Sequence, residues 1–316
     1  MIGRFAVFVL VVAALAPALR GDAAAPVLVA GGVTLAGVPV GGMSYEEAQA
    51  AVAPAFARPV HVFFGDRQWR LAPARFGGPV AVAEGVSRAL SAPSGSAVAL
   101  APRIDEAAVR AFVRALAKRI SYPAQDAKLI GLQGLTPQIG DARAGLAVLQ
   151  ALTRQRITRA LESPRHRRVR VGVKVLAPAV TTAHFGPVIV IRRGANELRY
   201  YLGSRLVRTF GVATGQSVYP TPVGTWNIVD MQRNPWWRPP NSPWAAGLKP
   251  IPPGPGNPLG TRWMGLSAAG VGIHGTPDSA SIGYSASHGC IRMLIPDAEW
   301  LFEHVRVGTP VVITDA

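Results

Sequence analysis

The C-terminal part of the chain, from Phe185 onward, consists of short strand-forming segments with little helix. Val188–Ile191 and Leu198–Leu202 flank a Gly-Ala-Asn-Glu turn, a pattern typical of a β-hairpin. Further strands are expected at Leu206–Val212, Thr225–Val229, Trp263–Leu266 and Val311–Thr314, and one helix from an N-cap at Asp297 to about His304. So many short strands predict a mostly-β domain over residues 185–315, either a β-sandwich or a barrel.

The preceding segment mixes helices and strands. Ser44 and Glu47 have the spacing of a capping box, which predicts a helix to about Ala53 that Pro54 ends. Two short strands are expected within residues 60–71, and an amphipathic helix from Asp105 to Ile120 whose basic side chains form a solvated surface.

Asp141 is expected to cap a third helix that continues to about Glu162. Arg168–Val175 alternates valine with polar residues, which predicts one half-buried strand, and Ala177–Thr182 has the composition of a linker. Residues 26–182 are therefore predicted to form an α+β module. Because this module has no cysteine and no cluster of histidines and carboxylates, we expect it to bind or position rather than to catalyse.

The N-terminus has the layout of a secretory signal. Arg4 precedes an apolar run from Phe5 to Leu19, and small residues follow at positions 23–25. Residues 1–25 are predicted to be a signal peptide or an uncleaved signal-anchor, so membrane contact is expected only through such an anchor. The net charge of +16 then faces an anionic cell envelope. No recognition helix, finger or aromatic RNA-binding motif favours nucleic acid as the partner.

Cys290 is the only cysteine, so the exported chain cannot form an internal disulfide and must be stabilised by its core. A thiol beside histidines is a candidate nucleophile, because the thiolate reacts and an imidazole can take its proton. His288 lies two residues before Cys290, and His274 lies sixteen residues before it. Glycines between them indicate a loop that brings His274 and Cys290 together.

His274 is the favoured base and is expected to form a thiolate–imidazolium pair with Cys290, with His288 as the alternative base. Backbone amides near Gly289 and Gly275 are candidate oxyanion donors, and Ser287, Thr276 and His288 are candidate orienting groups. Arg292 is expected to hold either a substrate carboxylate or an acidic partner. Zinc is disfavoured, because no cysteine pair or second histidine cluster accompanies these residues, and no cofactor is expected.

Residues 234–260 contain nine prolines in 27 positions, with Trp236, Trp237 and Trp244 among them. Proline at this density precludes a regular helix or strand ladder. A long irregular connection inside a compact domain is often a lid or a binding loop. The alternative is a rigid loop that covers a sheet edge with its tryptophans.

The runs His274–Thr276, Ser281–Gly283 and Ser287–Met293 together resemble the active-site motif of the YkuD-type L,D-transpeptidases. Thr221–Thr225 and Asn234–Trp236 resemble upstream segments of that family, so the likeness covers about residues 185–315. The spacing from His274 to Cys290 is slightly shorter than in members with longer loops, and Arg292 stands where some members carry asparagine. Residues 37–48 and 171–182 resemble the peptidoglycan-binding module that also occurs in VanW-like proteins.

The resemblance implies an exported, wall-associated enzyme that acts on peptidoglycan stem peptides. Cys290 would attack the carbonyl before a terminal D-alanine and form a thioester, which an amine from a second stem then resolves as a cross-link. Trp236, Trp237, Tyr284 and Arg292 are the expected substrate contacts. Water in place of the amine would make the protein an L,D-carboxypeptidase. A cysteine peptidase and a non-catalytic wall-binding protein that grips anionic polymers remain the alternative functions.

Overall fold

The computed structural model describes residues 27–77, 81–100 and 103–315. The predicted signal segment, residues 1–25, lies outside the described residues. The chain divides into two compact units. The first unit comprises Met1–Arg119 and Val148–Gly172, and the second comprises Ile120–Ala147 and Val173–Ala316. Among the described residues, no helix is both long and apolar enough to span a bilayer.

The first unit is an α+β module, as predicted. Its helices are α1 (Tyr45–Ala57), α2 (Ala81–Leu90), α3 (Glu106–Ile120) and α4 (Gln150–Glu162). Its strands form two small sheets, one of β1 (Thr34–Leu35), β2 (Val38–Pro39) and β5 (Ala97–Val98), the other of β3 (Val60–Phe64), β4 (Arg67–Leu71) and β9 (Arg168–Arg170). One core joins α1 and α2 to the first of these sheets.

Two helix starts of the first unit follow from side-chain caps. The Ser44 hydroxyl accepts from the Glu47 amide and the Glu47 carboxylate accepts from the Ser44 amide, which confirms the capping box. Asp105 caps α3 through the amides of residues 107 and 108. The predicted end of α1 was wrong, because the helix continues through Pro54 to Ala57. Phe56, only 4% exposed, lies in this last turn and packs in the core.

Three other local predictions for the module were wrong. Asp141 does not begin a helix, because Gly145–Val148 is strand β8 and pairs with β10 (Val173–Leu176). Helix α2 was not predicted. The expected strand Arg168–Val175 is broken at Gly172, whose carbonyl accepts from the Leu149 amide, so that its halves β9 and β10 join different sheets. At Asp141 and at Gly172, a long-range backbone pairing overrides the local pattern.

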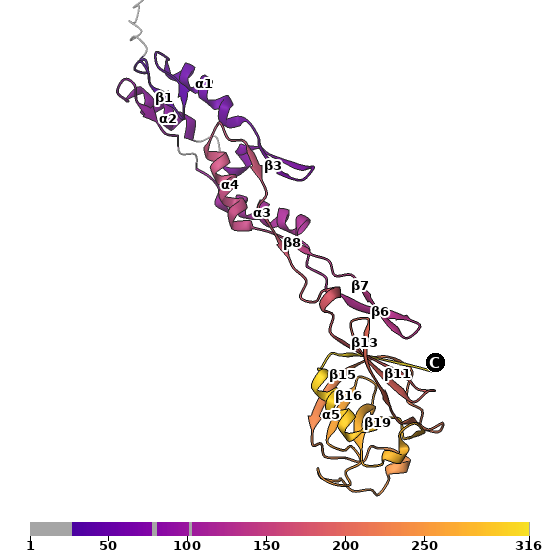
Figure 1. The fold of residues 1–316 in the computed structure, drawn as a ribbon. Coiled ribbons are helices and arrows are strands. Elements are labelled where there is room, and N and C mark those ends of the chain that lie inside the picture. The colour runs from indigo at the N-terminus through magenta and orange to yellow at the C-terminus, as the bar shows by residue number, and fades with distance from the viewer. Residues whose placement is uncertain (1–26, 78–80, 101–102, 316) are drawn as a thin grey trace, which may run out of the picture. The chain divides into compact units, whose positions relative to one another are not determined.

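The second unit is mostly strand. Its main sheet has eight strands in the order β13-β12-β11-β20-β15-β16-β17-β19 and forms a nearly closed, barrel-like surface. The strands are β11 (Pro187–Arg192), β12 (Glu197–Leu202), β13 (Arg205–Gly211), β15 (Gly224–Arg233), β16 (Arg262–Leu266), β17 (Gly272–Thr276), β19 (Ile291–Leu294) and β20 (Pro310–Thr314). These elements confirm the predicted hairpin and the predicted mostly-β domain. Helix α5 (Ile295–His304) packs against β16 and β17 (Figure 1).

Helix α5 begins earlier than predicted. Its N-cap is Leu294, and Pro296 occupies the first turn, where a proline costs no hydrogen bond. Asp297 therefore lies inside the helix, and its carboxylate accepts from the Arg208 guanidinium at 3.1 Å instead of capping the helix. Leu301 of α5 is fully buried beside Ile273 and Ile291, so that the helix fixes the strands that lead into the candidate site.

Strand β11 is covered on both faces, which explains its uninterrupted apolar run. Ile189 and Ile191 face the main core of the sheet. Val188 and Val190 pack instead with Leu129, Leu132 and Ile139 of a hairpin formed by β6 (Lys128–Gln133) and β7 (Thr136–Gly140). The Ser204 hydroxyl also donates to the Pro137 carbonyl at 2.6 Å. The hairpin thus belongs to the second unit, and the predicted domain boundary between residues 182 and 185 stays a prediction.

Candidate active site

His274 and Cys290 are brought together by two neighbouring parallel strands. Strand β17 pairs with β19 so that Ile273 lies opposite Ile291 and His274 lies opposite Arg292. Ile273 and Ile291 are fully buried in the core. Because successive side chains of a strand point to opposite faces, His274, Cys290 and Arg292 share the other face. The register of β17 and β19 is therefore the physical reason why His274, sixteen residues before Cys290 in the chain, lies on the same face as Cys290.

That face lies in a cavity of about 950 Å³. His274, Ser287, His288, Cys290 and Arg292 line one side. The proline-rich loop lines another side through residues that include Trp236, Trp237, Trp244 and Arg238, and the end of β15 adds Arg233. Of the described residues that line the cavity, three are arginines and none is a carboxylate, so the cavity favours an anionic ligand.

The His274 ring is held as a neutral base. It is 4% exposed, and its Nδ1 lies 2.7 Å from the Gly275 carbonyl, which can only accept a hydrogen bond. Nδ1 therefore carries the proton and Nε2 keeps its lone pair. The pKa of His274 is lowered from 6.5 to about 4, mainly by burial and in smaller part by the Arg292 charge, against the opposing effect of the Gly275 carbonyl. The imidazole is thus uncharged at neutral pH.

Trp263 of β16 fixes the plane of that ring. The two rings stack with centroids 6.0 Å apart and planes 29° apart. The indole also lies directly over Gly272, where a Cβ atom would come within 2.3 Å of the Trp263 ring. Glycine at position 272 is therefore required for Trp263 to lie beside His274.

The surroundings of the Cys290 thiol also favour its uncharged form. Burial raises its pKa, although a backbone hydrogen bond to Gly272 and the charge of Arg292 act in the opposite direction. The Sγ atom donates to the Gly270 carbonyl at 3.6 Å. A raised thiol pKa beside a lowered imidazole pKa favours the neutral pair. Desolvation of both groups acts against the expected thiolate–imidazolium pair, which stays a prediction.

The turn before Cys290 is held by two buried hydroxyls. Ser287, 1% exposed, donates to the Cys290 carbonyl at 2.5 Å and accepts from the Gly289 amide at 3.1 Å. Thr221, fully buried, donates to the Gly289 carbonyl at 3.0 Å and accepts from the Gly215 amide at 2.8 Å. Gly289 has φ +110°, which side-chain-bearing residues rarely adopt. The Gly289 amide is thus occupied by Ser287 and is not a free oxyanion donor.

His288 faces the proline-rich loop. Its ring stacks on Trp244 with centroids 4.1 Å apart and planes 17° apart, and Tyr219 lies 5.2 Å away. Partial burial and the Arg292 charge lower the pKa of His288. Sequence reasoning did not pair Trp244 with His288, and it assigned no role to Thr221. In the sequence, Trp244 is marked only by its place in the proline-rich segment, and Thr221 only by its place in a Thr-Pro-Val-Gly run.

Four of the predicted residues do not line the cavity: Gly275, Thr276, Tyr284 and Gly289. The Gly275 carbonyl orients His274, and the Thr276 hydroxyl accepts from the Asp278 amide at 3.1 Å. Tyr284 is 67% exposed on the outside of the site. Arg292 does line the cavity, and one of its amino groups lies 3.6 Å from the Asp278 carboxylate.

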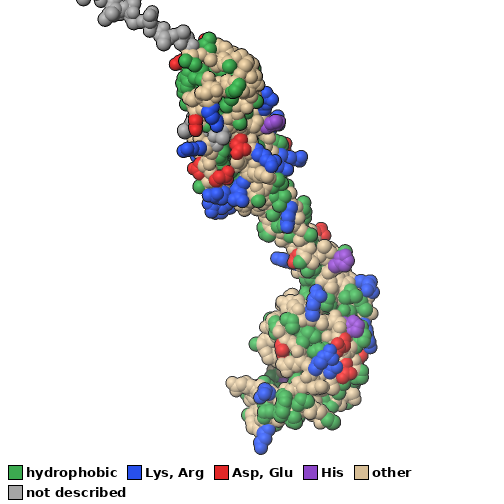
Figure 2. All heavy atoms as spheres, turned by 90° about the vertical axis from the view of Figure 1, so that its left-hand side faces the viewer, with side chains coloured by type: hydrophobic (Ala, Val, Ile, Leu, Met, Phe, Trp, Pro, Cys, Tyr) green, Lys and Arg blue, Asp and Glu red, His purple; other side chains and the backbone are tan. Residues whose placement is uncertain are grey.

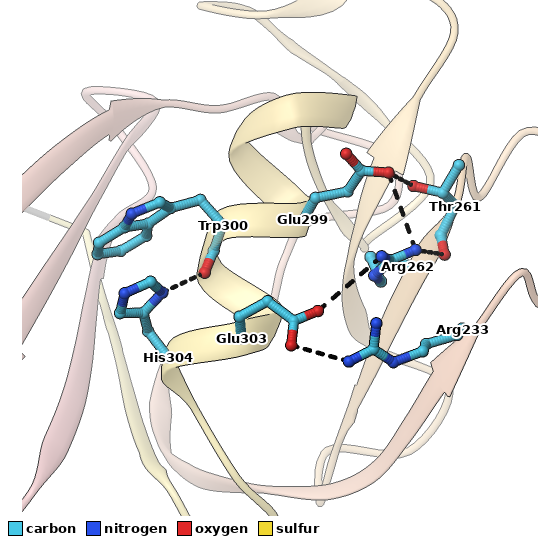
Figure 3. A network of polar contacts seen from close by, with 7 residues as sticks. All are labelled: Arg233, Thr261, Arg262, Glu299, Trp300, Glu303 and His304. Carbon is cyan, nitrogen blue, oxygen red and sulfur yellow. Dashed lines mark hydrogen bonds and ion pairs between the residues drawn. The ribbon is translucent and has the colours of Figure 1, made fainter.

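An ionic network joins α5 to strands β15 and β16 (Figure 3). Glu303 accepts from Arg233 of β15 at 2.8 Å and lies 3.9 Å from Arg262 of β16. Glu299 accepts from the Thr261 hydroxyl at 2.7 Å. Arg262 immediately precedes Trp263, so the network positions the strand end that places the indole on His274.

Comparison with known proteins agrees with this site. Residues 186–313 match the YkuD family model, described as the L,D-transpeptidase catalytic domain, and residues 75–170 match a model described as "Putative peptidoglycan binding domain". The chain belongs to the L,D-transpeptidase family and is an L,D-transpeptidase enzyme.

Two relatives are described as "Putative L,D-transpeptidase". The YkuD protein of Bacillus licheniformis is 32% identical over 176 residues, which are 55% of this chain and 94% of that protein. The YqjB protein of Bacillus subtilis is 36% identical over 134 residues, which are 41% of this chain and 72% of that protein.

Among the described residues, no group of three or more histidine, cysteine, aspartate or glutamate side chains is arranged so that it could hold a metal ion.

Proposed function

We propose that the protein is exported and cross-links peptidoglycan stem peptides through a thioester on Cys290. The observation that carries this proposal is the placement of Cys290 and His274 on one face of adjacent strands, in one cavity. The family membership supports the reaction class, and the peptidoglycan-binding model supports the wall as its location. The apolar run Phe5–Leu19 supports export.

The chemistry begins from the neutral pair. As Sγ of Cys290 attacks the carbonyl before the terminal D-alanine, Nε2 of His274 takes the thiol proton. The tetrahedral oxyanion collapses, the peptide C–N bond breaks, and the imidazolium returns the proton to the leaving D-alanine amine. The thioester is then attacked by an acceptor amine, whose proton passes to Nε2 and on to the released thiol. Starting neutral avoids the cost of a buried ion pair before substrate arrives.

The tryptophans of the proline-rich loop are proposed to favour the amine over water. Trp236 and Trp237 line the cavity, and exclusion of water from a closed site suppresses hydrolysis of a reactive acyl group. Replacing both by alanine should raise the ratio of hydrolysis to transfer. An unchanged ratio, with the acylation rate preserved, would remove this role from the loop.

Arg292 and Arg238 are proposed to attract the carboxylates of the stem peptide. Both line a cavity without a carboxylate of its own among the described residues. Arg292 can still bind a substrate carboxylate, because its amino group lies 3.6 Å from the Asp278 carboxylate and the Asp278 side chain is 58% exposed. The net charge of +16 favours binding to an anionic envelope. Peptidoglycan stem peptides are the expected substrates there.

Incubation with a tetrapeptide stem and intact-mass analysis tests the proposal. Wild-type protein should gain the mass of the stem minus D-alanine, and Cys290→Ala should gain nothing. An added amine should convert the adduct to a cross-linked product. Release of D-alanine with water as the only acceptor would identify an L,D-carboxypeptidase, and the absence of both adduct and release would leave a wall-binding protein.

A further inference from the structure

The first unit contains a basic groove between α3 and α4, far in sequence from the catalytic residues. Its volume is about 520 Å³, and its charged lining is Glu106 and Arg110 from α3 with Arg154 and Arg159 from α4. The two helices are linked by the Thr158 hydroxyl, which donates to the Glu106 carboxylate at 3.2 Å. The sequence pattern predicted only a solvated basic face on α3, because the arginines of α4 are more than forty residues away.

The three arginines of this groove have no anionic partner. Across the described residues, the ion pairs all belong to the second unit, from Arg192–Glu197 to Arg292–Asp278. Within the same described ranges, Arg110, Arg154 and Arg159 also make no side-chain hydrogen bond. One carboxylate against three guanidinium groups leaves the groove with a charge of +2. Figure 2 shows several Lys and Arg side chains on the visible face of the first unit, with acidic side chains among them.

We propose that this groove binds the phosphodiester groups of an anionic glycopolymer of the envelope. A guanidinium presents a planar fork of donors that matches phosphate, and a tetrahedral phosphate can accept from arginines on two helices at once. A carboxylate offers only two oxygens in one plane and cannot bridge the two helices as readily. The groove is open to solvent, so a polymer strand can reach it.

This binding site goes beyond the proposed transfer reaction. It would hold the enzyme on a phosphate-rich polymer, while the cavity around Cys290 acts on peptide stems. The groove and the cavity use different residues, and each can be tested without the other.

Titration calorimetry of the full chain with synthetic poly(glycerol phosphate) tests the groove. The triple variant Arg110→Gln, Arg154→Gln, Arg159→Gln should bind at least about tenfold more weakly than wild type, because each lost contact is charge-assisted. The matched control replaces Arg67, Arg70 and Arg114, exposed arginines of the same unit that do not line the groove, by glutamine. The control removes the same net charge and should bind within about twofold of wild type.

Circular dichroism and thermal melting establish that both triple variants are folded. Equal weakening in the two variants would show that only net charge matters and would overturn the proposal. Unchanged binding of poly(glycerol phosphate) by the groove variant would also overturn the proposal. Polyglutamate at the same charge concentration should bind more weakly than poly(glycerol phosphate), and phosphatidylglycerol vesicles should not compete for the groove. If polyglutamate or the phosphatidylglycerol vesicles bind more tightly than poly(glycerol phosphate), a phosphodiester polymer is rejected as the ligand.

Discussion

Lowering the pH from 7 to 4 is predicted to destabilise the second unit through the buried ring of His274. Its pKa is lowered from 6.5 to about 4, mainly by burial. Above pH 6.5 the ring is neutral in both the folded and the unfolded chain, so its contribution is constant. Between pH 6.5 and pH 4 the unfolded chain takes up a proton that the folded chain does not.

The size of the effect follows from the shift. One pKa unit corresponds to about 1.4 kcal/mol, so a shift of about 2.5 units removes about 3 kcal/mol of folding free energy between pH 7 and pH 4. This loss is a sizeable part of a typical domain stability. His274→Gln has no titratable group there and should lose about 3 kcal/mol less over the same range, even if it is less stable at pH 7.

Urea unfolding at several pH values, followed by tryptophan fluorescence, measures this difference. Six of the seven tryptophans lie in the second unit, so the signal reports mainly its unfolding. Arg292→Gln should reduce the pH dependence only slightly, because burial is the larger cause of the shift. If wild type and His274→Gln lose the same free energy between pH 7 and pH 4, the ring is already protonated in the folded state and the neutral-base argument fails.

Three further predictions concern the groups around this ring. Because burial raises the pKa of Cys290, iodoacetamide should alkylate it more slowly at pH 7 than a free cysteine, and the rate should still rise above pH 9; fast alkylation at pH 7 would indicate a thiolate. Thr221→Val keeps the shape but removes the hydrogen bonds to Gly289 and to the Gly215 amide, so unfolding free energy should fall by about 2 kcal/mol, with Thr221→Ser restoring most of it. Trp244→Ala removes the stacking on His288 and should raise KM for the stem peptide severalfold with a smaller change in kcat; an unchanged KM would place Trp244 outside substrate binding.

Sequence reasoning was more successful for residues 185–315 than for residues 26–182, for a physical reason. In the second unit, the hairpin β11–β12 and most strands could be predicted, since a turn signal and apolar runs act locally. Within residues 26–182, the predictions at Asp141 and Gly172 were wrong, because β8 pairs with a strand more than twenty residues away and the Leu149 amide donates to the Gly172 carbonyl. Such pairings leave no periodic trace in the sequence.

The sequence by itself determined the family and indicated Cys290 as the candidate nucleophile. A single cysteine in a Ser-His-Gly-Cys run, with His274 upstream, was enough to indicate the chemistry. Only the tertiary structure decided the state of the two groups. The β17–β19 register places both side chains on one face, and burial there lowers the pKa of His274 and raises that of Cys290, which favours the neutral forms. Ionisation depends on solvation and on neighbouring groups, and some of these are distant in the chain, such as Arg292 for His274 and Gly272 for Cys290.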